Sequence, residues 1–367
     1  MKGSLSAYVF WACLGAVLYT YVGYPVLLFL LAALTQTVRD LEFALARRER
    51  RTADREHLAP RVAMLVAAHN EQDVIEAKLR NTAALDYPQE QFEFLLGLDA
   101  PSDSTPARAQ SVKHPAFRVF HFADPSIGAV CGELRMVSPN GKFEMESLYW
   151  RYEVVLKFLE NRLNCVLGAN GGVFAVRRNL YLPPVSAIVE DFQVPMDIRY
   201  AGHRLVYDPE AVATEEVAPT YADEFRRKVR IGTGAFQTLF RSPKFLNPLK
   251  GLPAFAYFSH KVLRWIGPLL LIAVLITNVL LAMAAPIYAI LLAAQAAFYL
   301  LSGVGWLRVR SGRPGGLAGA AFYFTSMNLA LLLGLLRLLG GRQQTVWAAT
   351  PRRVPAHVAH VKGDLHE

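Results

Sequence analysis

The sequence contains few cysteines, and this limits the kind of fold it can have. Only Cys13, Cys131 and Cys165 occur in 367 residues, and their spacing is not that of a metal site. Cys13 also lies inside a long apolar run near the N-terminus. A disulfide framework is therefore not expected, and we place the polar part of the chain in a reducing compartment.

The sequence also lacks the marks of a cleaved signal peptide and of a nucleic-acid-binding protein. Residues 8–34 carry no charge, form a run longer than a signal-peptide core, and have no small-residue cleavage site before the basic stretch that follows. This run predicts a retained membrane anchor. The net charge is +9, but no aromatic-interleaved basic platform accompanies it, so nucleic acid is not an expected partner.

Apolar residues are abundant and unevenly distributed. The chain is 53% hydrophobic with a mean hydropathy of +0.24, which is too apolar for an ordinary soluble protein and too charged for a membrane protein throughout. Residues 266–284, 287–307 and 317–336 are three further runs that could cross a bilayer. The mixed-polarity region before them is long enough for one globular domain.

These runs predict five regions along the chain. They are an N-terminal transmembrane anchor (1–38), a basic linker (39–58), an α/β globular domain (59–248), an interfacial helix with about three transmembrane helices (249–340), and a basic tail (341–367). Five arginines between positions 47 and 55 follow the first span, and basic flanks mark the cytoplasmic side. We therefore expect a multi-pass protein of the cell's inner membrane with its globular domain in the cytoplasm. The basic tail favours the same side, whereas four spans would place it opposite, so its side stays open.

Two apolar segments predict parallel strands of an open sheet. Residues 62–68 and 92–98 have the strand pattern, and residues 73–85 between them have a helical one. In such β-α-β units ligands bind beyond the carboxyl ends of the strands. His69 and Asn70 follow the first strand and Asp99 follows the second, so both turns are expected to face one crevice.

A pair of carboxylates opens a later helix. Glu190 and Asp191 begin an apolar run that ends at Gly202, and a strand-like segment follows. A carboxylate at a helix N-terminus can be held ionised, which suits a proton acceptor. The alternative interpretation is a helix cap without catalytic function.

Taken in order, the motifs resemble those of a known enzyme family. They are Ala68-His69-Asn70-Glu71, Asp99 with Ser102, Asp103 and Thr105, Gly168-Ala169-Asn170-Gly171, Glu190-Asp191, and Arg227-Lys228-Val229-Arg230-Ile231. The chain resembles family 2 glycosyltransferases of the membrane-anchored group, which includes cellulose-, hyaluronan- and poly-N-acetylglucosamine-synthase-like enzymes. Ala100 stands where that family has a glycine, and only Arg230 of its Q-x-x-R-W motif is kept.

The resemblance implies a fold, a reaction and a set of site residues. The fold would be a GT-A-like, Rossmann-like open sheet. The nucleotide sugar, expected to be UDP-linked, would contact Ala68, Asn70, Glu71, Asp99, Asp103, Arg227 and Arg230. The acceptor, a glycan or a lipid-linked glycan beside the membrane lipids, would meet Gly168, Ala169, Asn170 and Gly171, for which a plain tight turn is the alternative. Asp191 would be the general base, with Glu190 beside it.

One element of the family pattern is missing. The helix and strand that normally carry a D-x-D motif, the ligand of Mg2+ or Mn2+, would fall at the Phe120/His121 junction, and no residue replaces them. The sheet would then be incomplete and no metal ligand is assigned. Two functions follow: an inverting membrane glycosyltransferase, or a catalytically impaired member acting as a membrane subunit of a glycan-synthesis complex. A transporter is disfavoured because the spans hold few ionisable groups.

Residues 259–265 resemble the amphipathic interfacial helix that these enzymes place before their spans. On this basis His260 and Lys261 are expected to contact lipid headgroups.

Overall fold

The computed structural model describes residues 2–46, 61–68, 71–84, 87–88, 91–98, 103–105, 124–137, 145–184, 189–216, 220–312 and 315–341. The chain forms two compact units. Unit 1 comprises Met1–Arg47 and Gly128–Trp347, and unit 2 comprises Arg48–Ile127 and Ala348–Glu367. The globular domain expected at residues 59–248 is thus divided between the two units.

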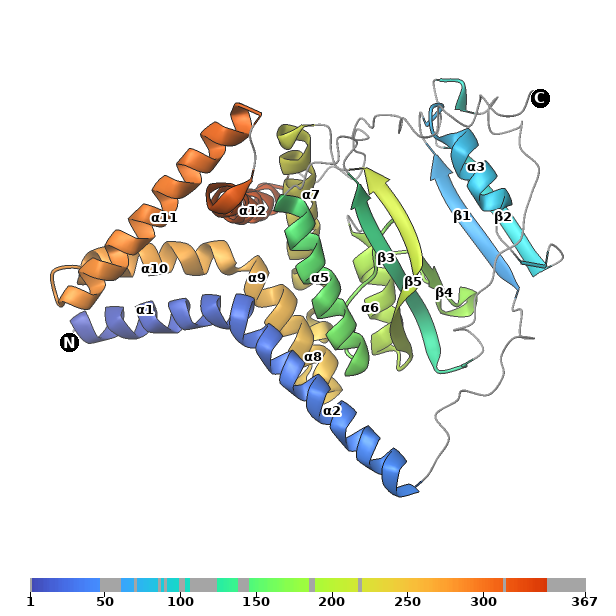
Figure 1. The fold of residues 1–367 in the computed structure, drawn as a ribbon, viewed down its shortest axis with the longest axis horizontal. Helices are drawn as coiled ribbons and strands as arrows, with labels where there is room; N and C mark the ends of the chain where they lie inside the picture. The colour runs from blue at the N-terminus through green and yellow to red at the C-terminus, as the bar shows by residue number, and fades with distance from the viewer. Residues whose placement is uncertain are drawn as a thin grey trace. The chain divides into compact units, whose positions relative to one another are not determined.

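Unit 1 begins with a long helix that bends once (Figure 1). It consists of α1 (Lys2–Leu18), the π-helical segment η1 (Tyr19–Gly23) and α2 (Tyr24–Ala46). Pro25 has no backbone N–H, so it leaves the carbonyl of Tyr21 without its usual helical donor. The hydroxyl of Tyr152 donates to that carbonyl at 3.3 Å, so a side chain from another helix stabilises the bend.

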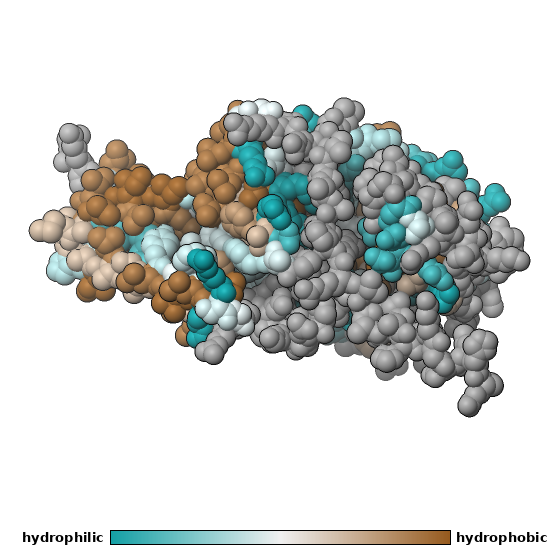
Figure 2. Space-filling view, turned by 90° about the horizontal axis from the view of Figure 1, so that it is seen from above, coloured by the Kyte–Doolittle hydropathy of each residue, from teal (hydrophilic) through white to brown (hydrophobic). Residues whose placement is uncertain are grey.

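Apolar helices make up the C-terminal part of unit 1. They are α10 (Gly267–Leu281), α11 (Pro286–Arg310) and α12 (Gly316–Leu339). Three helices are long and apolar enough to cross a membrane: Leu5–Phe43, Pro286–Arg310 and Gly316–Leu339. A bent pair, Leu252–Trp265 with Gly267–Leu281, makes up to four if it counts as one broken span. The predicted apolar runs are confirmed as helices, and Figure 2 shows hydrophobic surface gathered where α1, α10 and α11 lie.

A three-stranded sheet and several helices form the rest of unit 1. The sheet has the order β4-β3-β5, and β3 runs antiparallel to β4. The strands are β3 (Ile127–Val137), β4 (Phe174–Val176) and β5 (Arg204–Glu216). The longer helices are α5 (Met145–Arg162), α6 (Glu190–Tyr200) and α7 (Tyr221–Arg241), and the short ones are η4 (Arg178–Leu180), η5 (Pro243–Leu246), η6 (Pro248–Lys250), α8 (Leu252–Ala256), η7 (Tyr257–Val262) and α9 (Leu263–Trp265).

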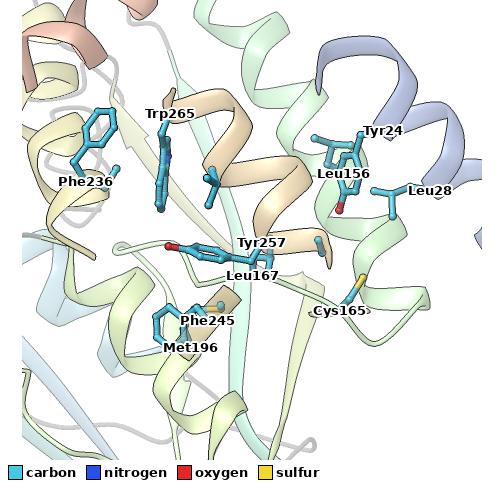
Figure 3. Close-up of a cluster of buried hydrophobic side chains, with 13 residues drawn as sticks. Tyr24, Leu28, Leu156, Cys165, Leu167, Met196, Phe236, Phe245, Tyr257 and Trp265 are labelled. Carbon is cyan, nitrogen blue, oxygen red and sulfur yellow. The ribbon is translucent and has the colours of Figure 1, made fainter. Parts of the chain in front are cut away.

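The main core of unit 1 joins these helices to the N-terminal helix. Its buried members come from α2, α5, α6, α7, the η5–α9 segment and the loop after α5, and include Tyr24, Leu156, Met196, Phe236 and Tyr257 (Figure 3). Burying large aromatic and aliphatic side chains of this kind contributes about 1.5–3 kcal/mol each. Hydrophobic burial therefore fixes α5 and α6 relative to the apolar helices.

Helix α7 and the apolar helix α12 touch through glycines. A Cβ on Gly334 would lie 2.7 Å from the backbone nitrogen of Thr233 and 3.0 Å from the Cα of Gly232. Two helices can approach this closely only where side chains are absent. The result is a direct backbone contact between a helix of the globular part and an apolar helix.

Unit 2 contains the β-α-β element predicted from the sequence. Strands β1 (Val62–Ala68) and β2 (Phe92–Leu98) are parallel, with Val62 opposite Phe92 and Ala68 opposite Leu98. Helix α3 (Ile75–Ala83) lies within the predicted helix and packs Ile75 and Leu79 against Ala68. The described strands form two sheets, one of two strands and one of three, and a single open sheet stays a prediction.

Candidate active site

Asp191 occupies the first turn of α6, as predicted from the sequence. Its side chain is half-buried, and burial raises the pKa of the carboxyl group above its usual value. The Lys157 ammonium, followed by backbone N–H groups of Gly171 and Phe192, acts in the opposite direction and favours the ionised form. Glu190 precedes it and is exposed. The site thus holds one carboxylate in a setting that suits reversible protonation.

The glycine-containing turn lies against this carboxylate. The N–H of Ala169 donates to the backbone carbonyl of Asp191 at 2.7 Å, and a Cβ on Gly171 would lie 3.3 Å from its Oδ2. Gly168 has a φ of +67°, and a Cβ there would lie 2.5 Å from the Phe192 ring. The structure therefore brings together Gly168, Ala169, Asn170, Gly171 and Asp191, which are separate motifs in the sequence. Whether the turn meets an acceptor remains a prediction.

Two arginines of α7 have different surroundings. Burial and the charge of Arg227 lower the pKa of the Arg230 guanidinium, whereas the nearby Asp191 carboxylate raises it. Arg230 therefore lies within electrostatic reach of Asp191. Arg227 instead forms a two-pronged ion pair with Glu224, with Nε to Oε2 at 2.8 Å and Nη2 to Oε1 at 3.2 Å. Of the two arginines predicted to bind the nucleotide sugar, Arg230 is the one that interacts electrostatically with the candidate base.

In unit 2 the turns after β1 and β2 meet, as their parallel pairing predicts. The N–H of Glu71 donates to Thr105 Oγ1 at 2.9 Å, and the N–H of Gln72 donates to Asp103 Oδ2 at 3.2 Å. Asp103 Oδ1 also accepts from the N–H of Thr105 at 2.9 Å. Burial acts to raise the pKa of Asp103, but these hydrogen bonds outweigh it and hold the pKa below the usual value. Asp103 therefore orders the turn on which Glu71 lies.

Several predicted site residues are not tested by this geometry. Asn70, Asp99 and the Phe120/His121 junction lie outside the described residues. Asp191 and the pair of Glu71 and Asp103 belong to different units. A crevice shared by Asp99 and Asp191 therefore stays a prediction.

The residues that the structure describes do not fit a divalent-cation site. No group of three or more His, Cys, Asp or Glu side chains among them could hold a metal ion. No catalytic step is therefore assigned to a metal below.

A buried polar cluster was missed by the sequence interpretation. Glu160 is 1% exposed, and its Oε1 accepts from the Tyr24 hydroxyl at 2.9 Å and contacts His260 Nδ1 at 2.6 Å. Glu153 pairs with Arg264 and, at 3.3 Å, with Lys261 Nζ. We call these six residues of α2, α5, η7 and α9 the α5 ion cluster: Tyr24, Glu153, Glu160, His260, Lys261 and Arg264.

This cluster overturns one prediction. His260 is 2% exposed and pairs with glutamates, so the expectation that it contacts lipid headgroups is wrong. The segment around it is almost wholly buried, including Ser259, Arg264 and Trp265. The only signal in the sequence was the helical spacing of Glu153 and Glu160, seven residues apart in an otherwise largely apolar stretch.

Comparison with known proteins gives one kind of match. No protein-family model and no curated protein sequence matches the chain. The fold is similar to the solved structure of the mannosyltransferase PcManGT from Pyrobaculum calidifontis in complex with GDP-Man and Mn2+. The TM-score is 0.60 at 19% sequence identity, covering 94% of this chain and 100% of that chain. At this identity the likeness establishes a shared fold and nothing further.

Proposed function

We propose that this protein is a membrane-embedded inverting glycosyltransferase. It would move a sugar from a nucleotide sugar, expected to be UDP-linked, to a polysaccharide or lipid-linked acceptor at the cytoplasmic face of the cell's inner membrane. The observation that carries the proposal is Asp191, a half-buried carboxylate at the start of α6, beside a glycine turn and within reach of Arg230. The glycosyltransferase fold and the membrane-length helices support it.

The proposed chemistry follows from these groups. An acceptor hydroxyl attacks the anomeric carbon, and its proton passes to the Asp191 carboxylate. The bond between that carbon and the diphosphate oxygen breaks, and the nucleoside diphosphate leaves with the electron pair. Arg230 would face the departing diphosphate, as guanidinium groups do in phosphate sites. A positioned base of this kind contributes about 10²–10⁴ in rate.

The substitution Asp191→Asn tests the base. The amide has nearly the same shape but accepts no proton, so transfer from a radiolabelled nucleotide sugar in membranes should fall by about 10²–10⁴. Glu76→Gln in α3, on the exposed surface of unit 2, is the matched control and should leave transfer unchanged. Turnover by Asp191→Asn at the rate of the control would refute the assignment.

A second candidate is a non-catalytic membrane subunit of a glycan-synthesis complex. The absence of a cation-binding group among the described residues favours it. Calorimetric titration of the purified full chain with UDP and GDP, with and without Mn2+, separates the two candidates. Binding strengthened by the cation supports the enzyme, and no binding of either nucleotide supports the subunit.

A further inference from the structure

Lys157 of α5 lies between the sheet and the glycine turn. Its Nζ donates to Asn170 Oδ1 at 2.9 Å and lies 3.4 Å from Cys131 Sγ on β3. It also lies 6.0 Å from the centre of the Tyr207 ring on β5. A half-buried ammonium loses part of its hydration, and this cost must be offset by hydrogen bonds such as the one to Asn170.

The partner of Lys157 holds the turn in place. The side-chain Nδ2 of Asn170 donates to the carbonyl of Gly132 on β3 at 2.9 Å. The backbone carbonyl of Asn170 accepts from the N–H of Val173 at 3.0 Å. Both ends of the Asn170 amide are therefore fixed, one by β3 and one by Lys157. The next residue is Gly171, whose N–H points to the Asp191 carboxylate. Lys157 is thus connected, through Asn170, to the residue that supplies that N–H.

Lys157 is also one of few charges that face Asp191. From α5 comes the Lys157 ammonium and from α7 the Arg230 guanidinium, while Glu190 on α6 itself is exposed. Strand β3 contributes the Cys131 sulfur, which lies 3.4 Å from Lys157 Nζ. Burial raises the pKa of a carboxyl group, and a nearby cation opposes this by favouring the charged form.

We propose that Lys157 is a positioning residue for the transfer reaction, fixing the Asn170 turn against β3 and keeping the Asp191 carboxylate in its charged, proton-accepting form. This inference rests on the proposed function. It adds a residue from outside the motifs that the sequence resemblance supplied. Lys157 acts through Asn170 and Asp191 and is not itself placed in contact with substrate.

Three variants separate the two parts of this role. Lys157→Met removes the charge and the donor, Lys157→Gln keeps a donor for Asn170 without the charge, and Lys157→Arg keeps both. Lys250→Met removes an exposed lysine that donates to the carbonyl of Tyr200, and is the matched control. Thermal unfolding of each purified full chain establishes that the variants are folded.

The first measurement does not depend on transfer. A water-soluble carbodiimide modifies protonated carboxyl groups, so labelling of Asp191, read by peptide mass spectrometry from pH 4 to pH 9, reports its protonation. Lys157→Met and Lys157→Gln should move the labelling midpoint up by about one pH unit, whereas Lys157→Arg and Lys250→Met should not. An unchanged midpoint in Lys157→Met and Lys157→Gln overturns the electrostatic part of the proposal.

The second measurement is the pH profile of transfer. In both neutral variants the acidic limb should move up with the labelling midpoint, giving about a tenfold loss on that limb for one pH unit. At alkaline pH Lys157→Gln should recover, whereas Lys157→Met should stay lower. Equal alkaline rates for Lys157→Met and wild type overturn the positioning part. If wild type transfers no sugar while Lys157→Met still shifts the labelling midpoint, the proposed function fails and the coupling of Lys157 to Asp191 stands.

Discussion

Two carboxylates of unit 1 illustrate opposite uses of burial. For Asp191, burial outweighs a single ammonium and a few N–H groups, so its pKa is raised. For Glu153, burial alone would raise the pKa, but Arg264, Lys261 and His260 together hold it well below the usual value. A carboxylate with too few partners is prepared to take up a proton, and one with several cations is prepared to stay charged. The difference separates the proposed catalytic site from the α5 ion cluster, which we interpret as structural.

Helix α5 serves both environments. Glu153 and Glu160 turn toward η7 and α9, while Lys157, one helical turn from Glu153, reaches Asn170 and β3. The aromatic rings of Phe192, Tyr257 and Trp265 connect the same regions, with ring centres 5.7 to 6.0 Å apart. The α5 ion cluster and the region around Asp191 are therefore parts of one packed unit. Substitutions can test how far stability and transfer depend on each of them.

The largest effect on stability is expected at the α5 ion cluster. Glu153→Gln leaves Arg264 and Lys261 buried without their carboxylate, which should cost about 3–5 kcal/mol of unfolding free energy. Because the folded-state pKa of Glu153 is depressed, its contribution is present at neutral pH and is lost as the pH falls through that depressed pKa. Denaturant titration in detergent measures the loss. Glu76→Gln, which breaks an exposed ion pair, should cost no more than about 0.5 kcal/mol. An equal loss in both variants would contradict the stabilising role of the α5 ion cluster.

A smaller loss is expected at the glycine turn. Gly168→Ala places a Cβ at a φ of +67° and against the Phe192 ring, so it should cost about 1–3 kcal/mol and reduce transfer by displacing the turn from Asp191. The control is Gly303→Ala in α11, where a Cβ meets no neighbouring atom. Thermal unfolding and transfer assays on both variants measure the difference. A wild-type melting temperature for Gly168→Ala would argue against this turn geometry.

Tyr24→Phe, also in the α5 ion cluster, should have a weaker effect on stability. It removes the hydroxyl that donates to Glu160 but leaves His260 as a partner, so about 1–2 kcal/mol is expected. Tyr8→Phe, at a largely exposed position of the same long helix, should be neutral. Chemical denaturation of the two variants side by side tests whether the hydroxyl matters.

The smallest stability effect is expected where the effect on catalysis is greatest. Because burial raises the folded-state pKa of Asp191, its favourable contribution to folding is present at low pH and is lost as the pH rises through that value. Asp191→Asn should therefore unfold at the wild-type temperature or slightly above it at neutral pH. Wild-type transfer should conversely rise with pH through the same range. A marked drop in the melting temperature of Asp191→Asn would assign Asp191 to the structure and blur the contrast with Glu153.

Local features of this molecule could be predicted from the sequence. The bounds of β1 and β2 follow from uninterrupted apolar runs, and α6 begins at Glu190, where two carboxylates precede an apolar segment. The contact of Gly168–Gly171 with Asp191 was not predicted, because the family resemblance only assigned the turn and the carboxylate separate roles. These features depend on short-range pattern, which a sequence displays directly.

Other features depend on contacts that the sequence does not display. His260 and Glu160 are 100 residues apart, and nothing local to residues 259–265 shows that a helix carrying glutamates will bury them. The division of the strands into two sheets likewise reflects long-range pairing. Lys157 belongs to no motif, and its importance follows only from the position of Asn170.

The contact of Gly334 with Gly232 and Thr233 has a mechanical consequence. The contact is between backbone atoms with no side chain between them, so a tilt of α12 would move α7 and the Arg230 guanidinium with it. The tilt of an apolar helix adjusts to hydrocarbon thickness. For the proposed membrane-embedded enzyme, turnover in vesicles should vary with lipid acyl length, because bare backbone contact between two helices would connect hydrocarbon thickness to the proposed site.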